Sequence, residues 1–318
     1  MSSELLIIGP SKVGKTAIVA SLSHAADQLS LFRQVYGDIV SIIAKNDDTQ
    51  ELFSKVINLV LDGYLPFQGS RDIISYLISI TSQTKSSSFW GALFGIKNTS
   101  KALISFPDAP GGALFPGDND EIDHVVMKQY QDEIVQKLQT VTGLIVCIDS
   151  SVLVEKATEK EKNEQHCVSI SFSKWLPSLF NKAIQTQTND TLALRKICFV
   201  LTKADLWAKK HNLGAMSETA VQNRNAYDHA KAILGQIFFL NIRKYFIESI
   251  EVGFCFSSVY GFYHGEPSPF FENTSENIAI AGIDNWKPYN IIEPFLFLSD
   301  VDMGQKNIQI LQWNDLGR

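Results

Sequence analysis

Residues 9–16 place glycines, lysines and a threonine at fixed spacing, in the order Gly9-Pro10-Ser11-Lys12-Val13-Gly14-Lys15-Thr16. The segment fits the pattern GxxxxGK followed by Ser or Thr, and it lies between an apolar run, residues 5–8, and a helical pattern that starts at Thr16. A strand, a glycine-rich loop and a helix in this order surround a phosphate with backbone N–H groups and the positive end of the helix dipole. We expect Lys15 to reach the β- and γ-phosphates of a nucleotide and the Thr16 hydroxyl to bind Mg²⁺. The residues expected to bind phosphate are Gly9, Ser11, Lys12, Val13, Gly14, Lys15 and Thr16.

A second candidate group, Asp108-Ala109-Pro110-Gly111, follows the strand expected at residues 102–106. At the carboxyl end of a strand beside a phosphate loop, Asp108 can hold Mg²⁺ through a water, and the Gly111 N–H can meet a γ-phosphate. Such a segment would sense the third phosphate, because it loses its anchor when that phosphate is hydrolysed. Asp and Gly also favour ordinary turns, so this interpretation depends on the position of the segment at a strand end.

Thr202-Lys203-Ala204-Asp205 follows another apolar run, residues 197–201, and supplies groups that can select a base. The Asp205 carboxylate can accept hydrogen bonds from the N1–H and the amino group of guanine, whereas adenine has an acceptor at N1 and no amino group beside it. The Lys203 stem can lie across the base. The alternative is a turn in which Asp205 caps a helix. Farther along the chain, residues 257–259 (Ser257, Ser258 and Val259) would offer backbone N–H groups to guanine O6.

Apolar runs and helical patterns alternate along the chain and predict the fold that positions these groups. Strands are expected at residues 5–8, 38–44, 73–80, 102–106, 144–149, 197–201 and 254–256, with helical patterns between most of them. The run at residues 144–149 is apolar throughout, which is typical of a parallel strand covered on both faces. The sequence therefore predicts a three-layer α/β fold of the phosphate-loop NTPase type, with a mostly parallel central sheet.

No Gly-, Pro- or Ser-rich linker divides the chain into separate domains. We expect residues 1–300 to form one nucleotide-binding domain that closes with a helix near its end, and residues 301–318 to form a C-terminal tail. A long helical region is expected at residues 217–250, and insertions are expected before the first switch and in the hairpin that precedes Asp108. The hairpin insertion carries an apolar patch, residues 89–96, which would contact a peripheral membrane surface or a partner protein, or fold back onto the sheet.

Composition restricts the class of protein. Of the 318 residues, 45% are hydrophobic and 19% are charged, which suffices for a sizeable core. A net charge of −6 and only six Arg give no basic footprint for nucleic acid. No pair of the four Cys has metal-binding spacing, so we expect reduced thiols in a cytoplasmic protein. Because the first strand is expected to begin at the N-terminus, we expect no signal peptide, and no apolar run approaches the roughly 20 residues that span a bilayer.

In their order and strand context, the motifs GPSKVGKT, DAPG, TKAD and SSV resemble those of the GTPase class that includes Ras, translation factors and dynamins. The resemblance covers residues 4–262 and lies in motifs rather than in overall sequence. Within this class, the chain looks most like the bacterial double-GTPase-like families of multi-gene conflict or regulatory systems. It shares with them an extra helix before the first switch, the approach Gly63-Tyr64-Leu65-Pro66 and the closing segment WKPYNIIEP from Trp286. The resemblance implies GTP or GDP and Mg²⁺ as cofactors, and a partner protein from the same system or a second copy of the chain.

The resemblance also implies a first-switch Thr that binds Mg²⁺ and the γ-phosphate, and here the chain departs from the family. The best match by position is Ser70, just before a sheet strand; the runner-up is Thr49, at a helix start where capping is the ordinary role. Ras-like enzymes carry a water-positioning Gln after DxxG, whereas this chain has Gly112, which has no side chain to orient water. Arg71 is either a built-in arginine finger or a solvated loop residue. The candidate catalytic residues are therefore Lys15, Ser70, Arg71 and Gly111.

Three functions fit these residues. The leading one is a switch that binds Mg–GTP and hydrolyses it slowly to GDP by attack of water on the γ-phosphate, and so regulates partner proteins. The second is a GTPase-fold scaffold that holds nucleotide and partners without useful turnover, which Gly112 and Ser70 favour. The third is a small-molecule or nucleotide kinase, which the scarcity of Arg and the TKAD motif argue against.

Overall fold

The structure is a computed structural model that describes residues 3–10, 13–34, 39–61, 74–85, 97–108, 124–154, 158–185, 191–267, 286–299 and 307–317. Within these residues an 8-stranded sheet has the order β10-β7-β6-β5-β1-β4-β3-β2. Its strands are β1 (Ser3–Ile8), β2 (Ile39–Ala44), β3 (Ile74–Lys85), β4 (Lys97–Asp108), β5 (Gly143–Asp149), β6 (Lys196–Thr202), β7 (Glu251–Phe256) and β10 (Gln309–Gln312).

The middle of the sheet is parallel, and its edges are antiparallel. Strands β4, β1, β5, β6 and β7 run parallel to one another, whereas β3, β2 and β10 are antiparallel to their neighbours. Alternate side chains of β1 enter two different cores: Leu5 and Ile7 face one layer of helices, and Leu6 and Ile8 face the other. Both faces are therefore covered, which explains why the central strands are apolar throughout. The predicted three-layer α/β fold with a mostly parallel sheet is confirmed.

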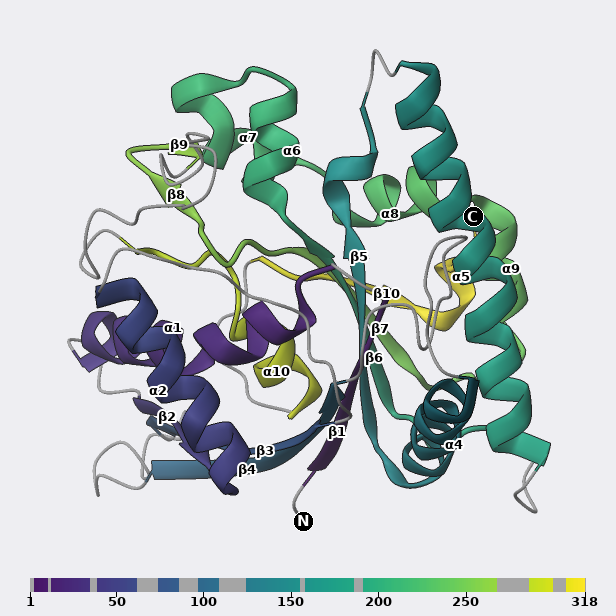
Figure 1. Cartoon of the computed structure of the whole chain (residues 1–318), viewed down its shortest axis with the longest axis horizontal. Coiled ribbons are helices and arrows are strands. Elements are labelled where there is room, and N and C mark those ends of the chain that lie inside the picture. The colour runs from purple at the N-terminus through teal and green to yellow at the C-terminus, as the bar shows by residue number, and fades with distance from the viewer. Residues whose placement is uncertain are drawn as a thin grey trace.

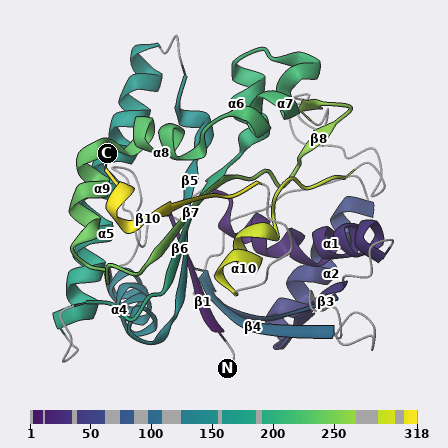
Figure 2. The same ribbon diagram turned by 180° about the vertical axis from the view of Figure 1, so that it is seen from behind.

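Helices form a layer on each face of the sheet, as Figures 1 and 2 show from opposite sides. One layer contains α1 (Lys15–Gln34), α2 (Asp47–Leu61) and the short α10 (Glu293–Leu298). The other contains α4 (His124–Thr140), α5 (Glu159–Gln185), α8 (Ala226–Leu234) and α9 (Gln236–Arg243). The chain leaves β1 for the first layer and β4 for the second, so the sheet has a topological switch point at the carboxyl end of β1. In open α/β sheets, ligands bind at that point.

The helical region expected at residues 217–250 is divided into α7 (Ser217–Asn223), α8 and α9. The Asn225 side chain accepts a hydrogen bond from the Asp228 N–H and caps α8, so the chain turns before this helix. Gly235, with φ of 84°, then ends α8. The expected region is therefore helical from Ser217 to Arg243, in three helices that Asn225 and Gly235 separate.

Within the segment expected to form a tail, the described residues 307–317 include a strand of the main sheet. Strand β10 pairs antiparallel with β7, and Trp313 and Leu316, which follow it, are buried. The Tyr227 hydroxyl accepts a hydrogen bond from the Gly317 N–H at 2.7 Å. A strand of four residues with two apolar side chains is too short a pattern to predict from sequence.

Membrane-related expectations are tested only in part. In the described ranges, none of the helices combines the length and the apolar character needed to cross a membrane. The apolar patch at residues 89–96 and the approach at residues 63–66 lie outside the described residues.

Cys147, Cys198 and Cys255 are buried, and each is a free thiol.

Candidate nucleotide-binding site

The phosphate-loop pattern lies between β1 and α1, at the carboxyl end of the central strand. A Cβ atom on Gly9 would lie 2.8 Å from the Cys147 carbonyl oxygen of β5, so only glycine fits this close approach. Gly14 has φ of 95°, a left-handed conformation that favours glycine. The Lys15 Nζ donates hydrogen bonds to the carbonyl oxygens of Gly9 (2.9 Å) and Pro10 (2.7 Å), which brings its ammonium against the loop. Ser11 and Lys12 lie outside the described residues.

The side chain of Thr202, at the end of β6, joins the base motif to the phosphate loop. Its hydroxyl lies 2.7 Å from the carbonyl oxygen of Val13 and 3.1 Å from that of Ile148. Because the hydroxyl has one hydrogen, it donates to one carbonyl at a time, and Val13 is the nearer. Two motifs that are 189 residues apart in sequence are therefore connected through a buried hydrogen bond.

Asp205 lies in the first turn of α6 (Ala204–Lys210) and is only 1% exposed. Its Oδ1 accepts a hydrogen bond from the Ser258 hydroxyl at 2.5 Å, whereas its buried Oδ2 has no hydrogen-bond partner in the described part of the chain. Burial raises the pKa of Asp205 to about 6, although hydrogen bonds from Ser258 and from the backbone at the start of α6 lower it. A buried carboxylate oxygen without a partner is costly, and a ligand with N–H donors would satisfy it.

The loop after β7 does not offer all of its backbone N–H groups to a ligand. The Ser257 N–H donates to the Leu201 carbonyl (2.8 Å), and the Ser258 N–H donates to the Tyr289 carbonyl (3.0 Å). The expectation that both bind guanine O6 is wrong, because the protein already uses them. The Val259 N–H donates to no other described residue, so it is the remaining candidate. The Ser258 hydroxyl instead holds Asp205.

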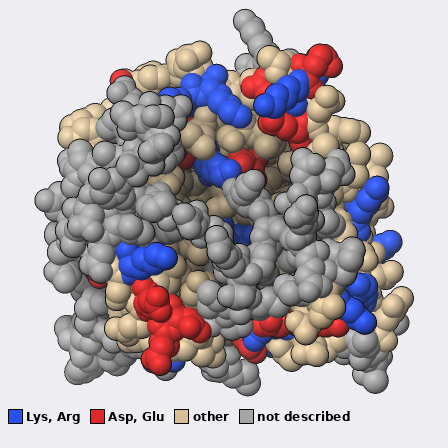
Figure 3. Space-filling view, viewed as in Figure 1, with Lys and Arg blue, Asp and Glu red and all other residues tan. Residues whose placement is uncertain are grey.

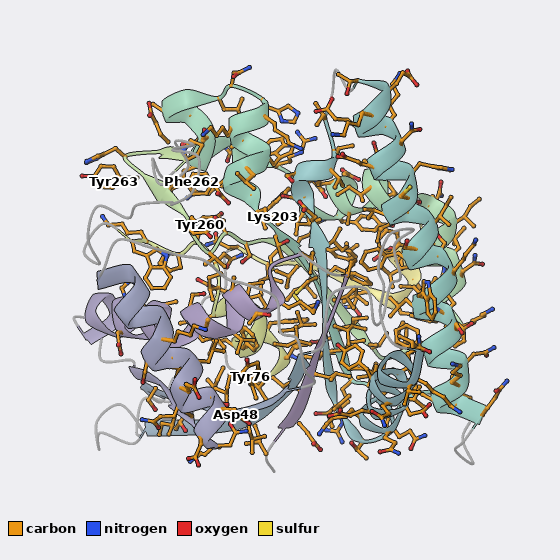
Figure 4. All side chains as sticks on the ribbon, in the orientation of Figure 1. Asp48, Tyr76, Lys203, Tyr260, Phe262 and Tyr263 are labelled. Carbon is orange, nitrogen blue, oxygen red and sulfur yellow. The ribbon has the colours of Figure 1, made fainter. Side chains whose placement is uncertain are left out.

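Lys203 is the residue that precedes α6, and its backbone is in a left-handed conformation (φ 57°, ψ 37°). Its Nζ lies 2.5 Å from the Asp149 carboxylate. Asp149 ends β5 directly beside Thr202 of β6. In Figure 4, Lys203 and Tyr260 lie between helices α6 and α1. Burial raises the pKa of Tyr260 to about 12, and the Asp205 charge adds to the effect. Asp149 was not predicted as a site residue. The sequence feature that could have indicated it is a carboxylate at the carboxyl end of an apolar strand.

The switch residues are described only in part. Asp108 is the last residue of β4, which runs parallel to β1, so its backbone lies at the same edge of the sheet as the phosphate loop. Ser70, Arg71, Gly111 and Gly112 lie outside the described residues.

The structure argues against Thr49 as the first-switch residue. This side chain is buried, and its hydroxyl donates to the Asn46 Oδ1 and accepts from the Leu77 N–H at 2.9 Å. The hydroxyl therefore connects the start of α2 to β3, so it is not available to bind Mg²⁺. The runner-up interpretation is wrong. The capping role expected for Thr49 belongs to Asn46 instead, whose Oδ1 accepts from the Thr49 N–H at 3.2 Å.

Charged side chains of both signs lie in the upper middle of this face. Figure 3 shows Lys and Arg side chains there, beside Asp and Glu side chains.

Comparisons with known proteins return distant similarities. No protein-family model matches the chain, and a search of curated proteins finds no match. The solved signal recognition particle receptor SRb-GTP/SRX complex from Chaetomium thermophilum is 12% identical; the match covers 83% of this chain and 93% of that chain, with a TM-score of 0.38. The Ski7 GTPase-like domain of S. cerevisiae, bound to GDP and inorganic phosphate, is 10% identical; the match covers 81% of this chain and 43% of that chain, with a TM-score of 0.32.

The class of fold follows from the chain's own topology. The phosphate loop follows the central strand β1. Strand β4 pairs parallel with β1 and forms an antiparallel hairpin with β3. The TKAD motif follows β6, and the SSV motif follows β7. These features define a phosphate-loop GTPase fold.

Proposed function

We propose that the chain binds GTP and GDP with Mg²⁺ and hydrolyses GTP slowly, as a switch that regulates partner proteins. The observation that carries this proposal is the geometry of Asp205. Ser258 holds one of its carboxylate oxygens, and the other is buried without a partner among the described residues. Thr202, three residues earlier, is bonded to the phosphate loop, so base and phosphate recognition would form one rigid unit.

Base selection would use three groups around the carboxyl ends of β6 and β7. The Asp205 carboxylate would accept the guanine N1–H and amino hydrogens, and the Val259 N–H would donate to O6. The Lys203 stem, held in place by Asp149, would lie against the base. Adenine offers neither donor to Asp205 and no acceptor at position 6, so it would be rejected.

Phosphate binding would use the loop N–H groups and Lys15, whose ammonium would turn from the loop carbonyls toward the β- and γ-phosphates. Mg²⁺ would be held by the Thr16 hydroxyl, by Asp108 and by Ser70, which provide the oxygen ligands that this cation prefers. When bound, Mg²⁺ neutralises charge on the β- and γ-phosphate oxygens. The Gly111 N–H would contact the γ-phosphate, so hydrolysis would release this segment and the Ser70 loop.

Slow turnover follows from the departure at Gly112. Water would attack the γ-phosphate without a glutamine to orient it, and Arg71 would supply transition-state charge as a built-in finger. A GTPase-fold scaffold without useful turnover is the second candidate function, and the same Gly112 supports it. We further propose a cytoplasmic location and membership of the bacterial double-GTPase-like families. The partner would be a protein of the same system or a second copy of the chain.

Calorimetry with the purified protein tests the proposal. Wild-type protein should bind GDP and GTP but not ADP or ATP, Lys15→Ala should abolish binding, and Asp205→Asn should relax the guanine preference. ATP binding as tight as GTP binding would refute the guanine site. Phosphate release from GTP, measured with and without the partner, then separates the switch from the scaffold.

A further inference from the structure

The segment Trp286–Asn290 opens the WKPYNIIEP motif, to which the proposed function gives no role. It is bonded along its length to the end of β7 and to the loop that follows this strand. The Trp286 Nε1 donates to the Val259 carbonyl (2.7 Å), and the Asn290 Nδ2 donates to the Phe256 carbonyl (2.8 Å). Tyr289 pairs with Ser258 through both backbone groups, at 2.8 and 3.0 Å. We call residues 286–290 the strap.

The strap and the loop approach so closely that one position of the loop must be glycine. A Cβ atom on Gly261 would lie 1.7 Å from the carbonyl oxygen of Lys287, and Gly261 has φ of 70°. The Gly261 N–H also donates to the Ser258 hydroxyl at 2.8 Å, the same hydroxyl that holds Asp205. The strap is therefore part of the wall that shapes the proposed base site, rather than a distant closing element.

The direction of the Val259 N–H follows from these bonds. In a trans peptide the N–H points opposite to the preceding carbonyl. The Ser258 carbonyl accepts from the Tyr289 N–H of the strap, so the Val259 N–H points away from the strap. Trp286 holds the next carbonyl, that of Val259 itself, so both peptide groups that flank the Val259 Cα are fixed.

Trp286 is itself held rigidly from the side of the phosphate loop. Its indole is fully buried and stacks on the His24 ring of α1, with ring centroids 4.3 Å apart and an interplanar angle of 4°. The His24 Nε2 lies 2.9 Å from the Trp286 carbonyl and donates to it, because a carbonyl oxygen only accepts. Helix α1 begins at the phosphate loop, so Trp286 connects that helix to the loop after β7.

We propose that Trp286 is a positioning residue for guanine recognition: it anchors the strap, whose Tyr289 N–H orients the peptide group that carries the Val259 N–H, and it fixes the following peptide group through the Val259 carbonyl, so that the Val259 N–H is directed at guanine O6. This inference rests on the proposed guanine site, and it assigns to the WKPYNIIEP segment the role of fixing base specificity. Trp286 itself does not touch the nucleotide.

The test compares Trp286→Phe, which keeps an aromatic ring against His24 and removes the indole N–H, with wild type. Calorimetry measures the affinities of GDP, of 6-thioguanosine diphosphate, whose sulfur replaces O6, and of inosine diphosphate, which lacks only the amino group. Trp286→Phe should weaken GDP binding roughly three- to tenfold, the loss of one well-placed hydrogen bond. The preference for GDP over the thio analogue should fall by the same factor, and the preference over inosine diphosphate should not change.

The matched control is Trp313→Phe, because Trp313 is a second buried tryptophan that lies beyond β10, away from the site. It should leave all three affinities unchanged. Equal losses for the three nucleotides with Trp286→Phe, or no loss, would overturn the inference. A wild-type protein that does not prefer GDP to ADP would instead refute the proposed function.

A second variant covers failure of Trp286→Phe to fold. Asn290 has φ of 52°, so Asn290→Gly keeps the left-handed backbone and removes the side-chain bonds to the carbonyls of Phe256 (2.8 Å) and Asn307 (3.4 Å). If the strap positions the loop, this variant lowers the preference for GDP over the thio analogue. An unchanged preference would contradict the role assigned to the strap.

Discussion

The ammonium of Lys203 lies 2.5 Å from a carboxylate oxygen of Asp149, and both side chains are largely shielded from water, with 29% and 19% of their surfaces exposed. The other oxygen of Asp149 accepts hydrogen bonds from the N–H (2.9 Å) and the hydroxyl (2.7 Å) of Ser151. The position of the Asp149 carboxylate is therefore fixed by Ser151, independently of the ion pair with Lys203. Because the ion pair holds the far end of the Lys203 side chain, it also sets where the apolar stem lies.

From this relationship we predict that Asp149→Asn weakens GDP binding several-fold, and that it does so only while Lys203 is present. In a Lys203→Ala background, Asp149→Asn should have almost no further effect, so a double-mutant cycle measured by calorimetry should show strong coupling. Ser151→Ala is the control, because it removes one bond to Asp149 and keeps the ion pair. Additive losses would show that Asp149 acts independently of Lys203.

The pKa of Asp205 predicts a pH dependence of guanine binding. Burial raises this pKa to about 6 in the free protein, and the ionised carboxylate is the form that accepts two hydrogen bonds from guanine. Binding below that pH must therefore release a proton, and the GDP dissociation constant should rise by up to about tenfold per pH unit below about pH 6. Above about pH 7, the contribution of Asp205 should be constant.

Asp205→Asn is the control for this measurement, because it keeps the acceptor for Ser258 and does not titrate. The phosphates of GDP titrate in the same range, so calorimetry should compare the slopes of the two proteins with pH. A wild-type slope no steeper than that of Asp205→Asn would mean that the carboxylate does not bind the base.

The phosphate loop and Asp205 could be predicted from the sequence because each depends on local chemistry: a strand, a turn and a helix start with fixed residue types. A role for Asp149 or Trp286 in the site could not be predicted. Their partners, Lys203 and Val259, are 54 and 27 residues away, so the contacts exist only through the strand register and the path of the closing segment. The backbone N–H of Ser258 was misassigned for the same reason, since nothing near it in sequence reveals its bond to Tyr289.

Burial of a neutral histidine predicts that acid destabilises the fold. His229 Nε2 donates to the Ser150 carbonyl (3.1 Å), and its Nδ1 accepts from the Arg224 Nε (2.9 Å), so the ring must be neutral. The pKa of His229 is lowered to about 4, mainly by burial and in smaller part by the Arg224 charge, while the bond to the Ser150 carbonyl opposes the shift. The unfolded chain binds the proton more tightly, so this stabilisation is present above about pH 6.5 and is lost as the pH falls toward about 4.

For His229 the expected loss is about 2 kcal/mol between roughly pH 8 and pH 5. His229→Gln does not titrate, so the unfolding free energy of wild type, measured by urea denaturation, should fall more steeply with acid than that of the variant. Parallel pH profiles would mean that His229 is protonated in the native state or accessible to water.

The hydroxyl of Thr202 tests whether base and phosphate recognition form one unit. Thr202→Val keeps the shape of the side chain, removes the hydrogen bond to the Val13 carbonyl, and leaves that buried acceptor without its donor. We expect a loss of about 1–2 kcal/mol in the free energy of unfolding. Because the damage is to the phosphate loop, GDP and inosine diphosphate should lose affinity by the same factor, unlike the base-selective loss expected for Asp205→Asn. Thr202→Ser keeps the hydroxyl and should restore both stability and binding. Normal affinities with Thr202→Val would show that the loop holds its shape without Thr202.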